Sequence, residues 1–134
     1  MIVVLDTSAA VELILNRPQK DIVESCLLKA DLVTSPVLYI SEIANVFWKY
    51  HQFESLKKEI CEELIEKSIQ LIDHYEPCST LYLEAFHLSC ETRQPLYDSL
   101  FIVLARRNNG MLVSLDKRLN ASAKIQKIRI IRHK

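Results

Sequence analysis

Four acidic residues stand alone in apolar surroundings, and their carboxylates could act together. Asp6 and Asp116 each end a short apolar run, and Asp98 precedes a longer one. Glu42 is the only charged residue between positions 32 and 48. Removing a carboxylate from water is costly unless a basic side chain, a helix N-terminus or a metal ion meets it. Each of these acids therefore marks a position where a positive partner is expected.

Gathered in one place, the four carboxylates would suit a hard divalent cation. Like charges raise one another's pKa, so the acids cannot all stay ionised at close range without a cation. Oxygen ligands with room for water suit Mg²⁺ or Mn²⁺ better than zinc. One or two such ions can activate water, bind a scissile phosphate and stabilise the leaving oxygen. A helix cap or a structural hydrogen bond would explain each acid singly, but the set favours metal-dependent phosphodiester chemistry.

The pattern of apolar residues predicts strands and helices in alternation. The predicted strands cover 2–5, 32–34, 72–78, 111–115 and 128–131. The predicted helices cover 9–15, 18–30, 35–51, 54–71, 79–93 and 97–108, with 117–123 as a loop or short helix. This order predicts an α/β fold, a three-layer α/β/α sandwich with a mainly parallel central sheet. The carboxyl ends of parallel strands share one edge, so the four acids are expected to converge there.

Some single residues carry further structural expectations. Ser35 and Pro36 are expected to open the helix 35–51, because proline suits a first helical turn. Trp48 is expected to pack into the core from that helix. Gly110 is the only glycine, and it is expected to end the helix 97–108 in the left-handed conformation.

Length and composition bound the class of protein. The 134 residues are 49% hydrophobic and 25% charged, which predicts a globular chain with a single domain at 1–134. No apolar run reaches the ~18 residues that a bilayer requires, and the first residues lack a basic signal-peptide opening. We therefore expect cytoplasmic residence and no membrane contact.

The cysteines predict no metal site of their own. No CxxC pair occurs, so free thiols in a reducing compartment are expected at Cys26, Cys61, Cys78 and Cys90. A zinc site is disfavoured, because the spacing is irregular among His74, Cys78, His87 and Cys90.

The zero net charge of the chain hides an asymmetry. Residues 1–91 hold fifteen acids and seven bases, a net charge of −8, whereas residues 92–134 hold two acids and ten bases, a net charge of +8. A basic third of a chain is typical of proteins that bind a phosphate backbone. The alternative is that this third simply packs against the acidic remainder.

Four short motifs follow one another with the acids in place. They are Val3 to Ser8, Ser35 to Val46, Tyr97 to Leu100, and Leu112 to Asp116. Together they resemble a PIN-domain ribonuclease, of the compact kind that forms the toxin half of VapBC toxin–antitoxin systems. The resemblance covers essentially the whole chain and implies a PIN-like fold that hydrolyses single-stranded RNA with Mg²⁺ or Mn²⁺.

The resemblance also implies roles for individual residues. Asp6, Asp98 and Asp116 would bind the metal, and Glu42 would bind it directly or through water, or position the attacking water. Carboxylates would be oriented by Thr7, Ser8, Asn45 and Ser114. Candidate RNA phosphate contacts, each also explained as an ordinary surface base, are Lys49, Arg93, Arg106, Arg107, Lys117 and Arg118. Tyr97 is a candidate for stacking on a base, and so is Trp48, although core packing is the favoured role for Trp48. A small antitoxin covering the acidic groove and a homodimer are implied as partners.

The chain departs from the family pattern in one place with consequences. Some members carry a further acid shortly after the fourth, where this chain has Lys117, Arg118 and Leu119. The sequence therefore leaves open whether one or two metal ions bind.

Other functions fit parts of the pattern. A haloacid-dehalogenase-like phosphotransferase also begins with a strand ending in Asp, but it needs a second Asp where this chain has Ser8. A receiver-type signalling domain would want paired acids near the N-terminus. A catalytically weak PIN-like module that binds RNA or a protein is the alternative from a different class.

Overall fold

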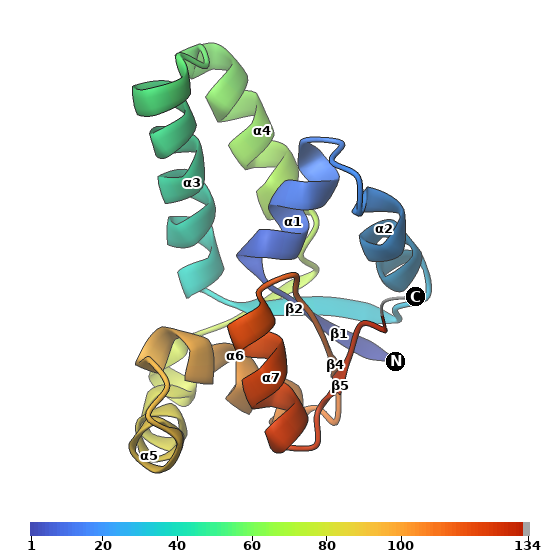
Figure 1. The fold of residues 1–134 in the computed structure, drawn as a ribbon, viewed down its shortest axis with the longest axis vertical. Helices are drawn as coiled ribbons and strands as arrows, with labels where there is room; N and C mark the ends of the chain where they lie inside the picture. Colours follow the sequence, from blue (N-terminus) through green and yellow to red (C-terminus); the bar gives the residue numbers. More distant parts are fainter. Residues whose placement is uncertain (133–134) are drawn as a thin grey trace.

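The computed structural model describes residues 1–132 and is organised around a parallel sheet (Figure 1). Its strands within this range are β1 (Ile2–Leu5), β2 (Leu32–Pro36), β3 (His74–Glu76), β4 (Met111–Val113) and β5 (Arg129–Ile130). They lie in the order β3-β2-β1-β4-β5, and every neighbouring pair is parallel. β1 is central because its aliphatic residues suit a strand covered on both faces. The predicted parallel sheet is confirmed.

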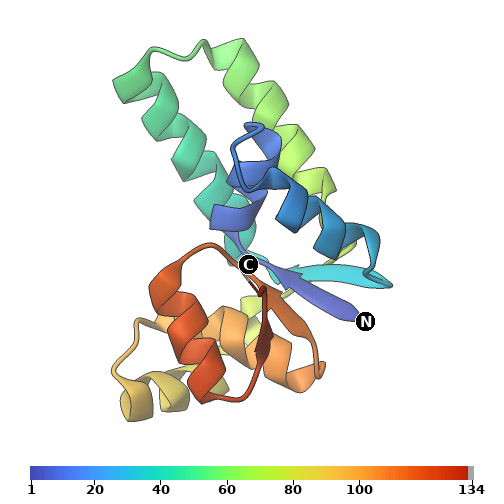
Figure 2. The same ribbon diagram turned by 45° about the vertical axis from the view of Figure 1, so that its right-hand side comes forward.

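Helices cover both faces of the sheet, which completes three layers. They are α1 (Thr7–Ile14), α2 (Lys20–Leu28), α3 (Leu38–Glu54), α4 (Lys58–Gln70), α5 (Tyr82–Thr92), α6 (Leu96–Arg107) and α7 (Lys117–Ile125), with a short 3₁₀ turn η1 (Cys78–Thr80). Figures 1 and 2 show α1 to α4 on one side of the sheet and α5 to α7 on the other. The predicted three-layer α/β/α sandwich is therefore confirmed.

The alternation of β1 side chains divides the core between the two layers. Val3 and Leu5 pack with residues of α1, α2, α3 and α4. Val4 points to the opposite face and packs with α5, α6 and α7. Successive strand residues face opposite sides of a sheet, so an uninterrupted aliphatic strand can serve both cores. Asp6, the next residue, is thereby fixed at the carboxyl edge of the sheet.

α6 is the most deeply placed helix of the second layer. Its residues 99–105 are all buried, because α5 and α7 cover it on the side away from the sheet. The apolar run after Asp98 accounts for this position, since a helix that is apolar on all sides belongs inside a protein. Asp98 therefore starts a buried helix beside the edge where Asp6 lies.

The structure corrects several single-residue expectations. Ser35 and Pro36 end β2 instead of opening α3, because both pair with β3, and the Ser35 hydroxyl donates to the Leu5 carbonyl at 2.9 Å. Trp48 is 52% exposed, and its neighbour Phe47 fills the core instead.

Gly110 has no positive φ, whereas Asn109 before it has a φ of 47°. Glycine at 110 serves a close approach: a Cβ there would lie 2.9 Å from the Ile2 carbonyl oxygen.

Two further observations concern the cysteines and the lengths of the apolar helices. All four cysteines are free thiols in the structure. Among the helices of residues 1–132, none is both long and apolar enough to cross a lipid bilayer.

Candidate active site at the carboxyl edge of the sheet

Asp6 is the most buried acid of the site, with 5% of its surface exposed. It follows β1 and caps α1, where its Oδ1 accepts a hydrogen bond from the Ala9 amide at 3.1 Å. The Ser8 hydroxyl donates to the same oxygen and the Ser114 hydroxyl donates to Oδ2, each at 2.7 Å. Burial nevertheless raises the pKa of Asp6 to about 6, because these hydrogen bonds only partly replace water.

Asp116 lies beyond the carboxyl end of β4, as Asp6 lies beyond the carboxyl end of β1. Its Oδ1 caps α7 by accepting from the amides of Arg118 and Leu119, at 2.9 and 3.1 Å. Serine hydroxyls connect it to Asp6: Ser114 Oγ accepts from the Asp116 amide at 3.0 Å and donates to Asp6. Two strand ends more than a hundred residues apart are thus held together by side chains of the site.

Glu42 reaches the edge from the first layer of helices. It lies in the second turn of α3, where it is half-buried, and its Oε1 accepts a hydrogen bond from the Thr7 hydroxyl at 3.2 Å. Burial raises the pKa of Glu42 to about 7, and the charges of Asp6 and Asp98 add to this increase. A carboxyl with this pKa can exchange a proton near neutral pH.

Asp98 comes from the opposite layer, in the first turn of α6, with 18% of its side chain exposed. Arg118 Nη2 lies 3.2 Å from its Oδ2, but not in hydrogen-bonding geometry. Within residues 1–132 this buried oxygen therefore has no hydrogen-bond partner. Burial raises the pKa of Asp98, the Arg118 guanidinium lowers it, and the charge of Asp116 raises it again.

Electrostatic coupling links all four acids into one group. Asp116 raises the pKa of both Asp6 and Asp98, while Asp6 and Asp98 both raise the pKa of Glu42. Such coupling requires that the carboxylates lie near one another. The structure thus brings four residues to one edge of the sheet: the residue after β1, one residue each of α3 and α6, and the residue before α7. Helices begin at this edge on both faces of the sheet.

The donor set fits a hard divalent cation, although the side chains are not arranged as a finished coordination sphere. In the described range 1–132, no group of three or more Asp, Glu, His or Cys side chains is placed so that it could hold a metal ion. The four acids offer only oxygen donors, and Asp98 Oδ2 is buried without a hydrogen bond. Both observations suit Mg²⁺ or Mn²⁺. Arg118 supplies the positive charge beside Asp98 in this arrangement.

The other predicted residues divide into those near the acids and those elsewhere. Thr7, Ser8 and Ser114 all hydrogen-bond to a carboxylate of the site. Asn45 is exposed, and its side chain makes no hydrogen bond with residues 1–132. Lys49 lies two helical turns after Glu42 and is also exposed.

The predicted basic residues are not all beside the acids. Lys117 and Arg118 begin α7 directly after Asp116, whereas Arg93 is an exposed residue between α5 and α6. Arg106 and Arg107 lie at the far end of α6 from Asp98, and each pairs with Glu84 at 2.8 Å. The structure does not bring these last two to the carboxylates. Tyr97, next to Asp98, is 61% exposed.

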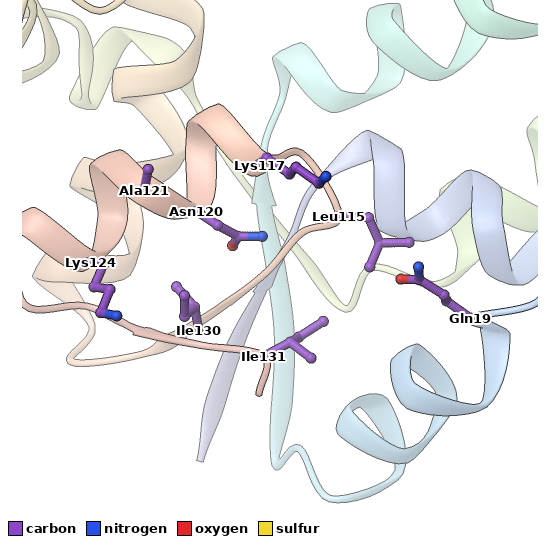
Figure 3. Close-up of a pocket in the computed structure, with 8 residues that line it drawn as sticks. All are labelled: Gln19, Leu115, Lys117, Asn120, Ala121, Lys124, Ile130 and Ile131. Carbon is purple, nitrogen blue, oxygen red and sulfur yellow. The ribbon is translucent and has the colours of Figure 1, made fainter. Parts of the chain in front are cut away.

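Asn120 belongs to the site but was not among the residues expected from sequence. Its Nδ2 donates to the Ser114 carbonyl at 2.9 Å, which ties α7 to the serine that supports Asp6. Its place one turn after the capping Asp116 is the only signal in the sequence that could have indicated this. Two cavities share Leu115 in their walls, and none of the four acids lines either of them: one of about 320 Å³ lies beside Thr7 and Ser8, and one of about 400 Å³ lies beside α7 (Figure 3).

Comparisons with known proteins agree with this architecture. The chain is 24% identical over 125 residues to Ribonuclease VapC3 of Pyrobaculum aerophilum, covering 89% of this chain and 92% of that protein. The crystal structure of PAE2754 from Pyrobaculum aerophilum superimposes with a TM-score of 0.74, at 19% identity, over 98% of this chain and 92% of that one. VapBC2 from Rickettsia felis, solved bound to a DNA fragment from the promoter, gives a TM-score of 0.67 at 17% identity, over 97% of each chain.

The family assignment rests on the sequence match itself. The model of the PIN domain matches residues 3–125, which include all four acids and every strand but β5. With an all-parallel sheet that gathers those acids at its carboxyl edge, the chain belongs to the PIN-domain family.

Proposed function

We propose that this protein is a Mg²⁺- or Mn²⁺-dependent endoribonuclease that hydrolyses phosphodiester bonds of single-stranded RNA, and that it is the toxin of a VapBC-type pair. The observation that carries the proposal is a set of contacts at one edge of the sheet. The Ser114 hydroxyl donates to Asp6 and accepts from the Asp116 amide. Glu42 accepts from Thr7, the residue after Asp6, and Asp98 lies 3.2 Å from Arg118, two residues after Asp116. The name of the VapC3 relative, a ribonuclease, supports the activity.

In this proposal three of the acids share one task and Glu42 has another. Asp6, Asp98 and Asp116 would hold the cation, which when bound would supply positive charge to the phosphate and lower the pKa of a bound water. The hydroxyls of Ser8 and Ser114 each donate to one oxygen of Asp6, so the Asp6 carboxylate is already oriented before a cation binds. Glu42 would bind the cation through water or accept the proton of the attacking water, because its half-buried carboxyl lies beside Thr7, next to Asp6.

Partners follow from the same comparison. The neighbouring structure from Rickettsia felis carries the VapBC name and was solved with a DNA fragment from the promoter, which supports a small antitoxin as the partner of this chain. The antitoxin would cover the acidic edge, and a homodimer is part of the proposal. RNA is the proposed substrate, with the +8 charge of residues 92–134 as its support.

The test compares two aspartate variants in an RNA cleavage assay with Mn²⁺. Asp98→Asn should abolish cleavage while the melting transition persists, since it removes the charge but keeps the shape of the side chain. Asp21→Asn, on the exposed side of α2, is the matched control and should cleave as the wild type does. Full activity in Asp98→Asn, with contaminating nuclease excluded, would refute the proposal.

Calorimetry separates the nuclease from a PIN-like module that only binds RNA or a protein. The nuclease should release or absorb heat on titration with Mn²⁺, and Asp98→Asn should reduce that heat. A wild-type protein that binds RNA but gives no heat with Mn²⁺ would favour the binding module.

A further inference from the structure

The cavity beside α7 differs in character from the acidic edge that it adjoins. We call it the α7 pocket, and it has a volume of about 400 Å³. Its apolar wall is formed by Leu115, Ile130 and Ile131, and its polar groups are two amides, Gln19 and Asn120, and two ammonium groups, Lys117 and Lys124. Figure 3 shows these side chains around one hollow, contributed by α7, β5, the segment before α7 and the turn before α2.

The charge of this region is uniformly positive. No carboxylate of residues 1–132 lines the α7 pocket, and neither Lys117 nor Lys124 forms an ion pair within that range. A second hollow of about 550 Å³ continues the surface and shares Lys124, Ile130 and Ile131 with the pocket, adding Arg129 and Arg132. The free ammonium groups thus face a surface that would attract an anion.

The α7 pocket is connected to the candidate active site by chain and by hydrogen bonds. Leu115 and Lys117 are the two neighbours of Asp116 in the chain. Asn120, which lines the pocket, donates to the carbonyl of Ser114, whose hydroxyl donates to Asp6. The pocket therefore adjoins the segment that carries Asp116.

We propose, on the basis of the nuclease function proposed above, that the α7 pocket holds a nucleotide of the RNA next to the scissile phosphate. The base lies against Leu115, Ile130 and Ile131, and the flanking phosphate is bound by Lys117 and Lys124. The amides of Gln19 and Asn120 stand at the rim of an apolar wall, the usual composition of a site that reads a flat ligand by a few polar groups. Single-stranded RNA fits, because its bases are free to leave the stack.

A binding assay without metal tests the pocket separately from cleavage. A short fluorescent single-stranded RNA of mixed sequence is titrated with the full chain in EDTA at several salt concentrations, and anisotropy is measured. Lys124→Gln should weaken binding and reduce the slope of log K against log salt by about 0.7, the value for one lost phosphate contact on a single strand. Lys58→Gln, an exposed lysine at the start of α4, is the matched control and should change neither.

A second variant tests the apolar wall. Ala121→Phe, at an exposed position that lines the pocket, fills it without changing charge. It should weaken RNA binding with an unchanged salt slope, and should alter the base preference next to the cleavage site in a map of cleaved RNA. A loss of helix packing would not change base preference, and melting curves of both variants confirm that they fold.

The results that overturn the proposal are distinct from those that overturn the nuclease function. Variants that bind RNA as tightly as the wild type does, or a wild type that binds no RNA in EDTA, would refute the nucleotide pocket. A competition experiment gives a further refuting result: an acidic peptide of equal charge displaces the labelled RNA as well as unlabelled RNA does. The apolar wall would then contribute nothing to binding. Failure of the nuclease function shows instead as wild-type protein without metal-dependent cleavage.

Discussion

The burial of Asp6 predicts that the protein is more stable without this charge. Asp6→Asn keeps the size of the side chain and removes the carboxylate that is 5% exposed. The pKa of Asp6 is raised from 3.8 to about 6, chiefly by burial. At about 1.36 kcal/mol per pKa unit, the ionised carboxylate costs the folded state roughly 3 kcal/mol relative to the unfolded chain.

Hydrogen bonding reduces the expected gain. Asp6 Oδ1 accepts from Ser8 and Ala9, and Oδ2 accepts from Ser114. An Asn side chain can keep its oxygen at the first position and place its amide near Ser114, whose hydroxyl must then turn away from its present acceptor. One rearranged hydrogen bond costs about 1 kcal/mol. The net prediction is a free energy of unfolding about 2 kcal/mol higher in Asp6→Asn above pH 7.

The pH dependence gives the prediction its sign. The raised pKa means that the folded wild type holds the Asp6 proton more tightly than the unfolded chain does. The stabilisation is fully present below about pH 4 and is lost as the pH rises to about 6, after which the cost is constant. Asp6→Asn lacks this component, so the gain over the wild type should grow between about pH 4 and 6 and then level off.

Urea unfolding followed by circular dichroism in EDTA measures both quantities, with Asp21→Asn as the exposed control. Saturating Mn²⁺ should then stabilise the wild type by about 2.7 kcal/mol at a hundred times the dissociation constant, and Asp6→Asn much less. An Asp6→Asn protein that is less stable than the wild type at pH 8, or that shows the same pH slope, would refute the reasoning from burial.

Four further variants test other features. Arg118→Ala should tighten Mn²⁺ binding by roughly fivefold in calorimetry, because a pair whose arginine is 63% exposed contributes about 1 kcal/mol to holding Asp98; weaker binding would show that Arg118 supports the site. Ser114→Ala should lower the rate of RNA cleavage at temperatures where the variant is still folded, since it removes the donor to Asp6 and the acceptor for the Asp116 amide. An unchanged cleavage rate with a lower melting temperature would make Ser114 purely structural. Gly110→Ala should cost about 1–3 kcal/mol in thermal unfolding, because its Cβ would meet the Ile2 carbonyl at 2.9 Å, whereas Asn109→Gly, with its φ of 47°, should be neutral or stabilising.

The sequence was sufficient to predict the α/β layers and the place of the acids. Asp6 and Asp116 follow apolar runs that are too short for anything but strands, so parallel pairing puts both at one edge. Asp98 precedes a run that is apolar on all sides, and such a helix has to be central. These signals depend only on neighbouring residues, so a single sequence is enough to detect them.

Features that depend on distant partners escaped prediction. Ser35 and Pro36 look like a helix start, but β3 pairs with them from forty residues away. Gly110 looks like a left-handed cap, and its actual constraint is the backbone of Ile2. The contact of Arg118 with Asp98 is a further case, since nothing in the local sequence indicates which acid an arginine meets.

The strand order has a consequence for the protein while it is being made. β1 pairs with β4, and the hydroxyl that donates to Asp6 belongs to Ser114, so β1 is made well before the segment that completes its surroundings. At about 5 to 20 residues per second, translation separates the two by roughly 5 to 20 s. A nascent chain that stops short of Asp116 can therefore hold no assembled carboxylate cluster beside the translation machinery and its RNA, and the acids can meet only after the segment that carries Ser114 and Asp116 has been made.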